Sequence, residues 1–210
     1  MESYIEIKNL SKKIKKNTVL NNINLELQKG KIYGFRGING SGKTMLFRAI
    51  CGLITPTEGE IIINNKILHK DISFPESVGI LIENPGFLPN YSGKKNLKLL
   101  ADIKGIIREG EIDKILNLVG LDCNDTRKYK QYSLGMKQKL GIAQVLMENP
   151  DLILLDEPTN ALDEKSVQNV LGIIYEEKQK GKTILIASHD NYTLEKISDE
   201  IINIENGKII

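Results

Sequence analysis

Residues 37–44 read Gly-Ile-Asn-Gly-Ser-Gly-Lys-Thr and match the pattern G-x-x-x-x-G-K-[ST]. An apolar segment at 31–35 precedes this run, and a helical pattern over about 42–53 follows it. In that position the glycines let the backbone wrap around phosphate oxygens, and the N–H groups at the helix start point toward them. The motif therefore restricts the chain to folds in which a strand, a phosphate-binding loop and a helix follow one another.

The chemistry of the side chains assigns roles within this loop. Lys43 would reach the β- and γ-phosphates of a nucleotide, and the Thr44 hydroxyl would ligate Mg²⁺. Met45 keeps its backbone N–H but offers no hydroxyl. The predicted phosphate-binding residues are Gly37, Ile38, Asn39, Gly40, Ser41, Gly42, Lys43, Thr44 and Met45.

A second acidic site lies further along the chain. Residues 152–155 form an apolar strand pattern that ends in Asp156 and Glu157. In P-loop ATPases an acid at a strand end holds Mg²⁺ through water, and we assign that role to Asp156. Glu157, one residue further on, is placed to accept a proton from an attacking water.

The pattern of apolar residues predicts an α/β fold with a mostly parallel sheet. Alternation at 4–7 and 23–27 suits antiparallel strands, a strand is predicted at 60–64, and 78–82 is a strand of the buried type. Three helical stretches between about 92 and 149 predict a helical subdomain inserted into this core. A helix at 164–180, a strand at 183–187 and a hairpin at 201–210 that turns at Asn206-Gly207 complete the chain.

Composition excludes several classes of function. The 210 residues carry 29 basic and 27 acidic side chains, a net charge of +2, which argues against wholesale electrostatic binding of nucleic acid. No apolar run approaches the roughly 20 residues that span a bilayer, and the first residues do not resemble a signal peptide. We therefore expect a cytosolic protein unless a partner holds it at a membrane. Cys51 and Cys123 are expected to be reduced thiols.

Four further segments resemble the motifs of ABC-type ATPases. Residues 132–139, Tyr-Ser-Leu-Gly-Met-Lys-Gln-Lys, resemble the signature motif, and residues 160–163, Asn-Ala-Leu-Asp, resemble the D-loop. Ser188-His189 resembles the switch histidine, and Glu83 occupies the Q-loop position. The order and spacing match over essentially the whole chain. The chain therefore resembles one complete nucleotide-binding subunit of an ABC transporter. This resemblance implies a single domain over residues 1–210. The expected core is 1–83 and 150–210, and the expected helical subdomain is about 84–149.

The resemblance implies a mechanism and partners. Two subunits would close head to tail around two Mg-ATP, with the signature residues Ser133, Leu134, Gly135 and Met136 facing the ATP of the partner subunit. His189 would contact the γ-phosphate and orient the water, and Asp163 would link the two sites. The partners implied are a second ATPase subunit, either a copy or a paralogue, and an integral-membrane permease on whose inner face the chain would lie. No nucleic-acid partner is expected.

Some positions depart from the usual family pattern. Glu83 stands where the family usually has Gln, and a carboxylate there can still reach Mg²⁺. With Asn-Pro-Gly-Phe at 84–87, it resembles the bacitracin and lantibiotic (bacteriocin) self-immunity exporters, which implies export of a peptide or antibiotic-like compound. An exposed turn glutamate that says nothing about cargo is the alternative. Ile14 replaces an aromatic residue that stacks on adenine in many relatives, so Ile14 or Val19 would supply the adenine contact.

Several alternatives stay open on the sequence alone. A different class of function is an ATP-gated soluble interaction module that is not coupled to transport. A small-molecule P-loop kinase would leave the signature, D-loop and switch histidine without a role. Residues 86–89, Gly-Phe-Leu-Pro, would either plug the core or dock the membrane partner.

Overall fold

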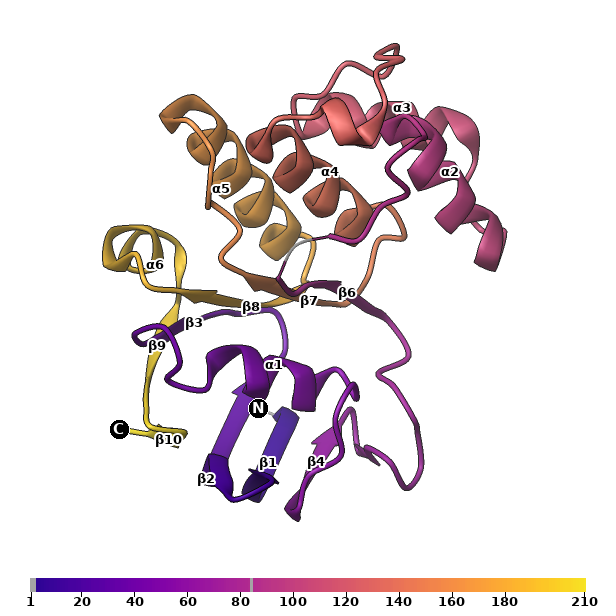
Figure 1. Ribbon diagram of the computed structural model, residues 1–210. Coiled ribbons are helices and arrows are strands. Elements are labelled where there is room, and N and C mark those ends of the chain that lie inside the picture. The colour runs from indigo at the N-terminus through magenta and orange to yellow at the C-terminus, as the bar shows by residue number, and fades with distance from the viewer. Residues whose placement is uncertain (1–2, 84) are drawn as a thin grey trace.

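A six-stranded sheet in the order β10-β9-β3-β8-β7-β6 lies at the centre of the computed structural model, which describes residues 3–83 and 85–210 (Figure 1). Met1, Glu2 and Asn84 are outside the described residues. The pairs within the sheet are parallel except for the antiparallel pair of β9 with β10. The strands are β3 (Ile32–Arg36), β6 (Val78–Leu81), β7 (Leu152–Asp156), β8 (Thr183–Ser188), β9 (Glu200–Glu205) and β10 (Lys208–Ile209). The predicted mostly parallel sheet is confirmed.

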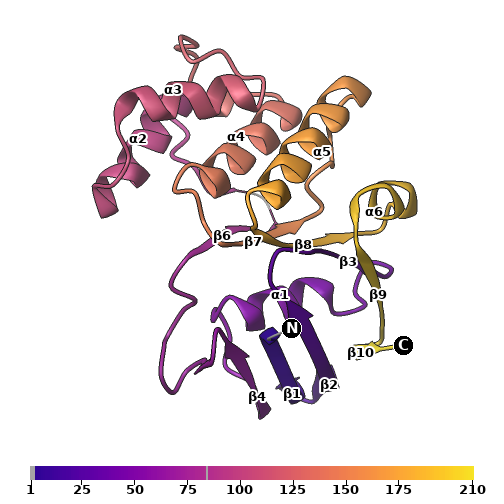
Figure 2. The same ribbon diagram turned by 180° about the vertical axis from the view of Figure 1, so that it is seen from behind.

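The central strands bury side chains on both faces of this sheet. In β7, Leu152 and Leu154 pack into the core on the side of α1 (Lys43–Ile50), whereas Ile153 and Leu155 pack into the core on the side of the longer helices. Strands covered on both faces are continuous apolar runs, which explains the unbroken sequence of β7. Seen from behind, α1 lies on one side of the sheet and α4 (Leu134–Leu146) and α5 (Glu164–Gln179) on the other (Figure 2).

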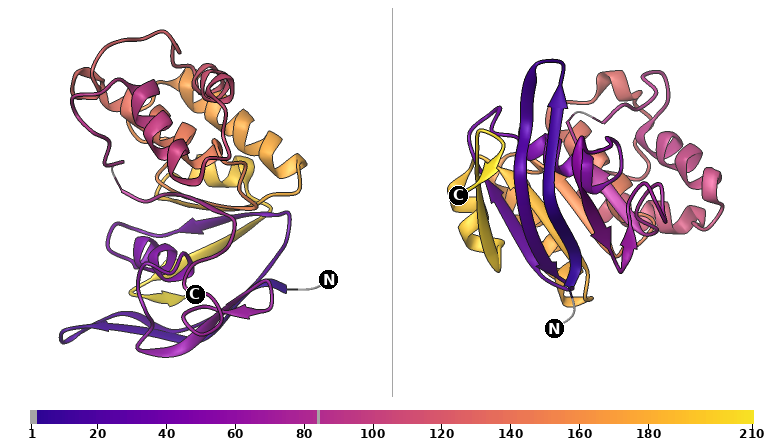
Figure 3. Two further views of the ribbon diagram at one scale, coloured as in Figure 1. Left: turned by 90° about the vertical axis from the view of Figure 1, so that its right-hand side faces the viewer. Right: turned by 90° about the horizontal axis from the view of Figure 1, so that it is seen from below.

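A four-stranded antiparallel sheet, in the order β2-β1-β4-β5 among the described residues, covers the other side of α1 (Figure 3). Its strands are β1 (Ser3–Ile14), β2 (Asn17–Gln28), β4 (Glu58–Ile63) and β5 (Lys66–Ile67). The predicted strands at 4–7 and 23–27 are confirmed as antiparallel partners, but β1 and β2 are longer than predicted. Several register shifts interrupt their pairing, and the burial alternation of β1 is broken between Ile7 and Leu10, where one of these shifts lies.

The chain between β6 and β7 forms α2 (Gly93–Lys104), α3 (Glu109–Leu118), the 3₁₀ turn η1 (Tyr129–Gln131) and α4. The three predicted helices are thus confirmed. Helix α4 packs closely against β6 at Gly79. A Cβ on Gly79 would come within 2.4 Å of the Val145 carbonyl oxygen, so the absence of a side chain allows this approach. The limits of a helical subdomain at about 84–149 stay a prediction, and its first residue, Asn84, is outside the described part of the chain.

The last third contains one helix that the sequence did not predict, α6 (Asn191–Ile197), between β8 and β9. Gly181 has φ +83° just after the C-cap of α5, and Asn206 and Gly207 have φ +49° and +74°. These values confirm the predicted helix stop and the predicted hairpin turn. Both cysteines are free thiols. Within residues 3–83 and 85–210, no helix has the length and apolarity that a bilayer crossing requires.

Candidate functional site: a nucleotide cavity at the phosphate loop

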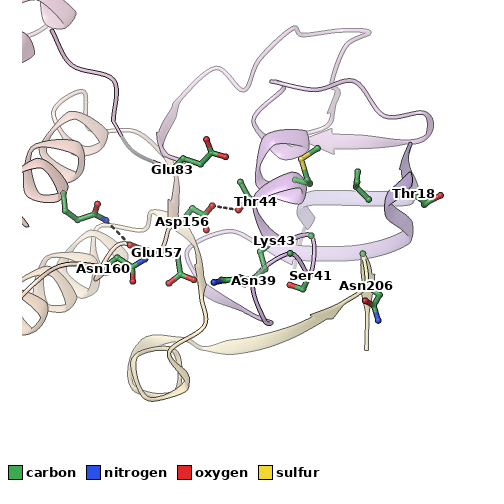
Figure 4. A pocket seen from close by; sticks show the side chains of 16 residues that line it. Thr18, Asn39, Ser41, Lys43, Thr44, Glu83, Asp156, Glu157, Asn160 and Asn206 are labelled. Carbon is green, nitrogen blue, oxygen red and sulfur yellow. Dashed lines mark hydrogen bonds between the residues drawn. The ribbon is translucent and has the colours of Figure 1, made fainter. Parts of the chain in front are cut away.

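A cavity of about 620 Å³ opens at the loop between β3 and α1 (Figure 4). The loop residues Asn39–Met45 form one wall, and the ends of β6 and β7 contribute carboxylates to another. The remaining lining comes from β2, α4, the C-terminal hairpin and Asn160, which lies between β7 and α5. The lining residues are 39–45, Thr18, Val19, Glu83, Gln138, Asp156, Glu157, Asn160, Asn206 and Gly207. The fold thus collects into one cavity the loop and both predicted acids.

The phosphate loop is tightly packed on its inner side. A Cβ on Gly37 would lie 2.4 Å from the Ile204 carbonyl oxygen, so glycine is required there, and Gly42 caps α1 with φ +112°. Lys43 is 5% exposed, and its Nζ donates to the carbonyl oxygens of Gly37 at 2.5 Å and Ile38 at 3.2 Å. The ammonium group is therefore held inside the curve of the loop. The Ile38 side chain is 75% exposed.

Thr44 and Asp156 meet directly at the start of α1. The Thr44 hydroxyl donates to Asp156 Oδ2 at 2.6 Å, although the two residues are far apart in sequence. Burial raises the pKa of Asp156, and the charges of Glu157 and Glu83 raise it further, while the bond from Thr44 and the charge of Lys43 oppose that rise. A hydroxyl and a carboxylate that lie together are oxygen donors of the kind that Mg²⁺ prefers.

Glu157 is fixed by groups at and just after the end of β8. Its Oε1 accepts from the His189 backbone N–H at 3.0 Å and lies 2.9 Å from His189 Nδ1, and its Oε2 accepts from the Ser188 hydroxyl at 3.2 Å. The backbone of Glu157 has φ +51°, a left-handed conformation that is strained for a residue with a side chain. Its carbonyl oxygen accepts from Gln138 Nε2 at 2.9 Å. The predicted base and switch histidine are therefore in contact. Ser188 and Gln138 belong to segments that the sequence singles out, but their contacts with Glu157 were not predicted.

The predicted signature residues 133–136 and the D-loop residue Asp163 are outside the described lining of the cavity, whereas Gln138 and Asn160, from the same two segments, line it. Ser133 caps α4 and accepts from the Met136 N–H, and Leu134 is 68% exposed. A Cβ on Gly135 would come within 2.9 Å of the Ala161 carbonyl oxygen, so the start of α4 packs on the D-loop. Asp163 caps α5, and the hydrogen bonds from Ser166 lower the pKa of its carboxyl group.

The far end of the cavity is built from β2 and the C-terminal hairpin. Val19 lines it, whereas Ile14 is 43% exposed and is not among the described residues that line it. Thr18 and Asn206 also line this end, and neither was predicted as a site residue. The hairpin is joined to the phosphate loop because the Gly207 N–H donates to the Ser41 carbonyl oxygen at 2.8 Å. The sequence predicts the turn at Asn206-Gly207, but only the packing of the fold brings it to Ser41.

A phosphate loop that opens a helix, with an acid pair at the end of a parallel strand beside it, defines the class of P-loop nucleoside triphosphatases. A family model described as "ABC transporter" matches residues 20–160. The chain belongs to this family, as an ABC-type ATP-binding subunit with ATPase chemistry.

Relatives of this kind match over nearly the whole chain. It is 51% identical over 205 residues to the uncharacterized ABC transporter ATP-binding protein YybJ of Bacillus subtilis, which covers 98% of this chain and 94% of that protein. It is 41% identical to the lantibiotic transport ATP-binding protein SrtF of Streptococcus pyogenes, covering 98% and 89% of the two chains. It is 38% identical to the bacitracin transport ATP-binding protein BcrA of Enterococcus faecalis, covering 100% and 69%.

Solved structures show the same fold. The dimeric form of MJ0796, described as a bacterial ABC transporter cassette, superposes with a TM-score of 0.89 at 28% identity, over 98% of this chain and 96% of that one. A dimeric post-hydrolysis state of MJ0796 bound to ADP and Pi gives a TM-score of 0.88 at 25% identity over the same shares. The predicted fold class, an ABC-type P-loop NTPase, is confirmed.

Proposed function

We propose that this chain is the motor subunit of an exporter: it hydrolyses ATP within a head-to-tail dimer and drives a separate membrane permease. The observation that carries the proposal is the position of Glu157. Its carboxylate is held by Ser188 and His189, and it lines the same cavity as Lys43 and the pair Thr44–Asp156.

ATP would bind with its phosphates in the loop 37–45, of which residues 39–45 line the cavity, and the N–H groups at the start of α1 would donate to them. Lys43 would turn its ammonium from the loop carbonyls toward the β- and γ-phosphates. Val19, at the far end of the cavity, is the better of the two predicted adenine contacts, because Ile14 is not in the described lining.

The donor set fits Mg²⁺, which when bound would neutralise charge on the phosphates. The Thr44 hydroxyl and the Asp156 carboxylate would hold the ion, Asp156 through water, and the Glu83 carboxylate lines the same cavity. Among the described lining residues, oxygen donors predominate over the single sulfur atom, the thioether of Met45.

Hydrolysis needs a base for the attacking water. Glu157 would accept the water proton, and the three hydrogen-bonding contacts from Ser188 and His189 fix the direction of its carboxylate. His189 is 54% exposed in its side chain, so its ring has room to contact the γ-phosphate as well.

The exposed start of α4 supports a dimer. Ser133 and the Gly135 backbone lie outside the cavity of their own chain and would donate to ATP in the cavity of the other, next to Asp163. The dimeric MJ0796 structures support this arrangement. The second subunit would be either a copy of this chain or a paralogue, and no nucleic acid is expected.

The names of SrtF and BcrA, a lantibiotic and a bacitracin transport ATP-binding protein, support a peptide or antibiotic-like compound as the cargo, which this chain would export through a permease. The chain would then act at the cytoplasmic face of the cell membrane. The alternative, an ATP-gated soluble module, has no observation in its favour. Residues 86–89 divide between both predicted roles: Phe87 packs edge-on against Tyr129 in the core, whereas Leu88 is 50% exposed and available to a partner.

The decisive experiment uses tagged Glu157→Gln, which should bind Mg-ATP, accumulate as a dimer and hydrolyse ATP at least about 100-fold more slowly than the wild type. With Mg-ATP, this variant should recover a multi-spanning protein in stoichiometric amount from solubilised membranes. For Lys43→Ala, addition of ATP should not change the amount of that protein that is recovered. Recovery of soluble partners alone would refute transport, and hydrolysis at the wild-type rate would refute Glu157 as the base.

A further inference from the structure

The carboxylate of Glu83 is paired with Arg48 at the boundary between two cavities. Arg48 NH2 lies 2.7 Å from Glu83 Oε1. Glu83 lines the nucleotide cavity, whereas Arg48 lines a neighbouring cavity of about 390 Å³ together with Leu81 and Pro85. Arg48 is in the last turn of α1, one turn beyond Thr44, so one helix carries both the metal-facing hydroxyl and the partner of Glu83.

The backbone reinforces the direction of this side chain. Glu83 has φ +59°, a left-handed conformation that a residue with a Cβ adopts only when its surroundings hold it there. The two side chains are 34% and 61% exposed, and exposed ion pairs contribute little to stability. The main effect of the ion pair is therefore to fix the position of the Glu83 carboxylate, not to stabilise the fold.

The charge balance of the nucleotide cavity makes that position matter. Three carboxylates line it, those of Asp156, Glu157 and Glu83, and the ammonium group of Lys43 is held by loop carbonyls. Among the described residues, no three acidic, histidine or cysteine side chains converge in a way that could hold a metal. Glu83, turned to Arg48, is thus kept apart from the acids at the end of β7.

We propose that Arg48 is a positioning residue that holds Glu83 at the rim of the nucleotide cavity and thereby limits the affinity of the site for a divalent cation. The proposal rests on the proposed nucleotide site. Without Arg48, the Glu83 carboxylate is uncompensated and free to turn toward Thr44 and Asp156, where it adds a negative oxygen ligand. Loss of Arg48 should therefore strengthen cation binding, and only when residue 83 carries its carboxylate.

The test is a double-mutant cycle on the full chain, with Mn²⁺ as the probe. Free Mn²⁺ is measured by electron paramagnetic resonance in the presence of a saturating non-hydrolysable ATP analogue, so that hydrolysis plays no part in the signal. Arg48→Ala should lower the Mn²⁺ dissociation constant by about three- to tenfold, the size expected for one nearby unscreened charge. Arg48→Lys, which keeps the charge, should stay within about twofold of the wild type.

In the Glu83→Gln background, Arg48→Ala should change the dissociation constant by less than about twofold. Glu195→Gln is the matched control, because Arg36 NH2–Glu195 Oε1 is also 2.7 Å, with 29% and 62% of the two side chains exposed. It should leave Mn²⁺ binding unchanged.

Two results would overturn the proposal: an unchanged constant in Arg48→Ala, or an equal shift with and without the Glu83 carboxylate, which would mark a direct effect of the lost Arg48 charge or of packing on α1. Failure of the wild-type chain to bind Mn²⁺ with the analogue would instead refute the nucleotide site itself.

Discussion

At the scale of single residues, the site is built from groups that the folded chain holds in unfavourable states. Asp156 is a buried carboxylate that has its pKa raised, and Glu157 has a left-handed backbone. Such features lower stability and persist where surrounding contacts impose them. A carboxyl group with a higher pKa in the folded than in the unfolded chain binds its proton more readily when folded. The folded state is therefore favoured as pH falls, and it loses that contribution as pH rises through the folded-state pKa.

Asp156→Asn should consequently raise the stability of the nucleotide-free chain. The same substitution should weaken Mg-ATP binding. The amide removes the buried charge and still offers an oxygen to the Thr44 hydroxyl. We expect the midpoint of thermal unfolding at pH 7.5 to rise by about 2–4 °C, equivalent to ~1 kcal/mol, and the gain to shrink as pH is lowered.

Asp199→Asn is the contrasting variant for this measurement. Burial acts to raise the pKa of Asp199, but the Ile32 N–H and Lys178 outweigh it, so that its pKa is lowered and its charge stabilises the fold above the unfolded-state pKa. Asp199→Asn should therefore lower the unfolding midpoint at pH 7.5. A fall in both variants would contradict the account given for Asp156.

At the scale of elements, the C-terminal hairpin is hydrogen-bonded to both the phosphate loop and β2. The Gly207 N–H donates to the Ser41 carbonyl oxygen, and its carbonyl accepts from the Asn21 N–H, each at 2.8 Å. A Cβ on Gly207 would lie 2.5 Å from the Val19 carbonyl oxygen, and φ there is +74°. Gly207→Ala should thus displace the hairpin from both the loop and β2.

We expect Gly207→Ala to weaken ATP binding about tenfold, a change of ~1.4 kcal/mol, in equilibrium titration. Gly181→Ala is the matched control: its φ is +83°, but a Cβ there would meet nothing within 4 Å. That variant should lose about 1 kcal/mol of folding free energy from the left-handed conformation alone. Equal ATP affinity in both variants would show that the hairpin does not support the loop.

How much could be predicted differs between elements for physical reasons. Strands β7 and β8 are evident because both faces are buried and every residue is apolar or small, apart from Asp156 at the end of β7. Helix α6 has only seven residues, with Thr193 and Leu194 buried, which is too short to display a helical period. Within the site, local motifs identify the phosphate loop and the acid pair. The pairing of Glu83 with Arg48 and the hydrogen bond from Gly207 to Ser41 depend on packing between distant segments, which no local pattern encodes.

At the scale of the whole molecule, the described chain presents an unfinished site. The cavity holds the loop and the acids, while Ser133 lies exposed at the start of α4 outside its lining. If two chains meet head to tail, each complete site combines the loop of one chain with the signature of the other. We expect Lys43→Ala to inactivate a chain's own loop, and Ser133→Arg to inactivate the site of its partner because the long side chain would block the signature contact.

Each of these variants alone should be nearly inactive as a homodimer, and a mixture of the two should regain phosphate release. In an equal mixture about half of the dimers pair the two variants, and each such dimer has one intact site, so independent sites would restore roughly a quarter of the wild-type rate. Mixing Lys43→Ala with Glu157→Gln is the control that should restore nothing, because the intact loop then belongs to a chain that lacks the base. If Lys43→Ala with Ser133→Arg stays as inactive as that control, the signature does not complete the partner's site.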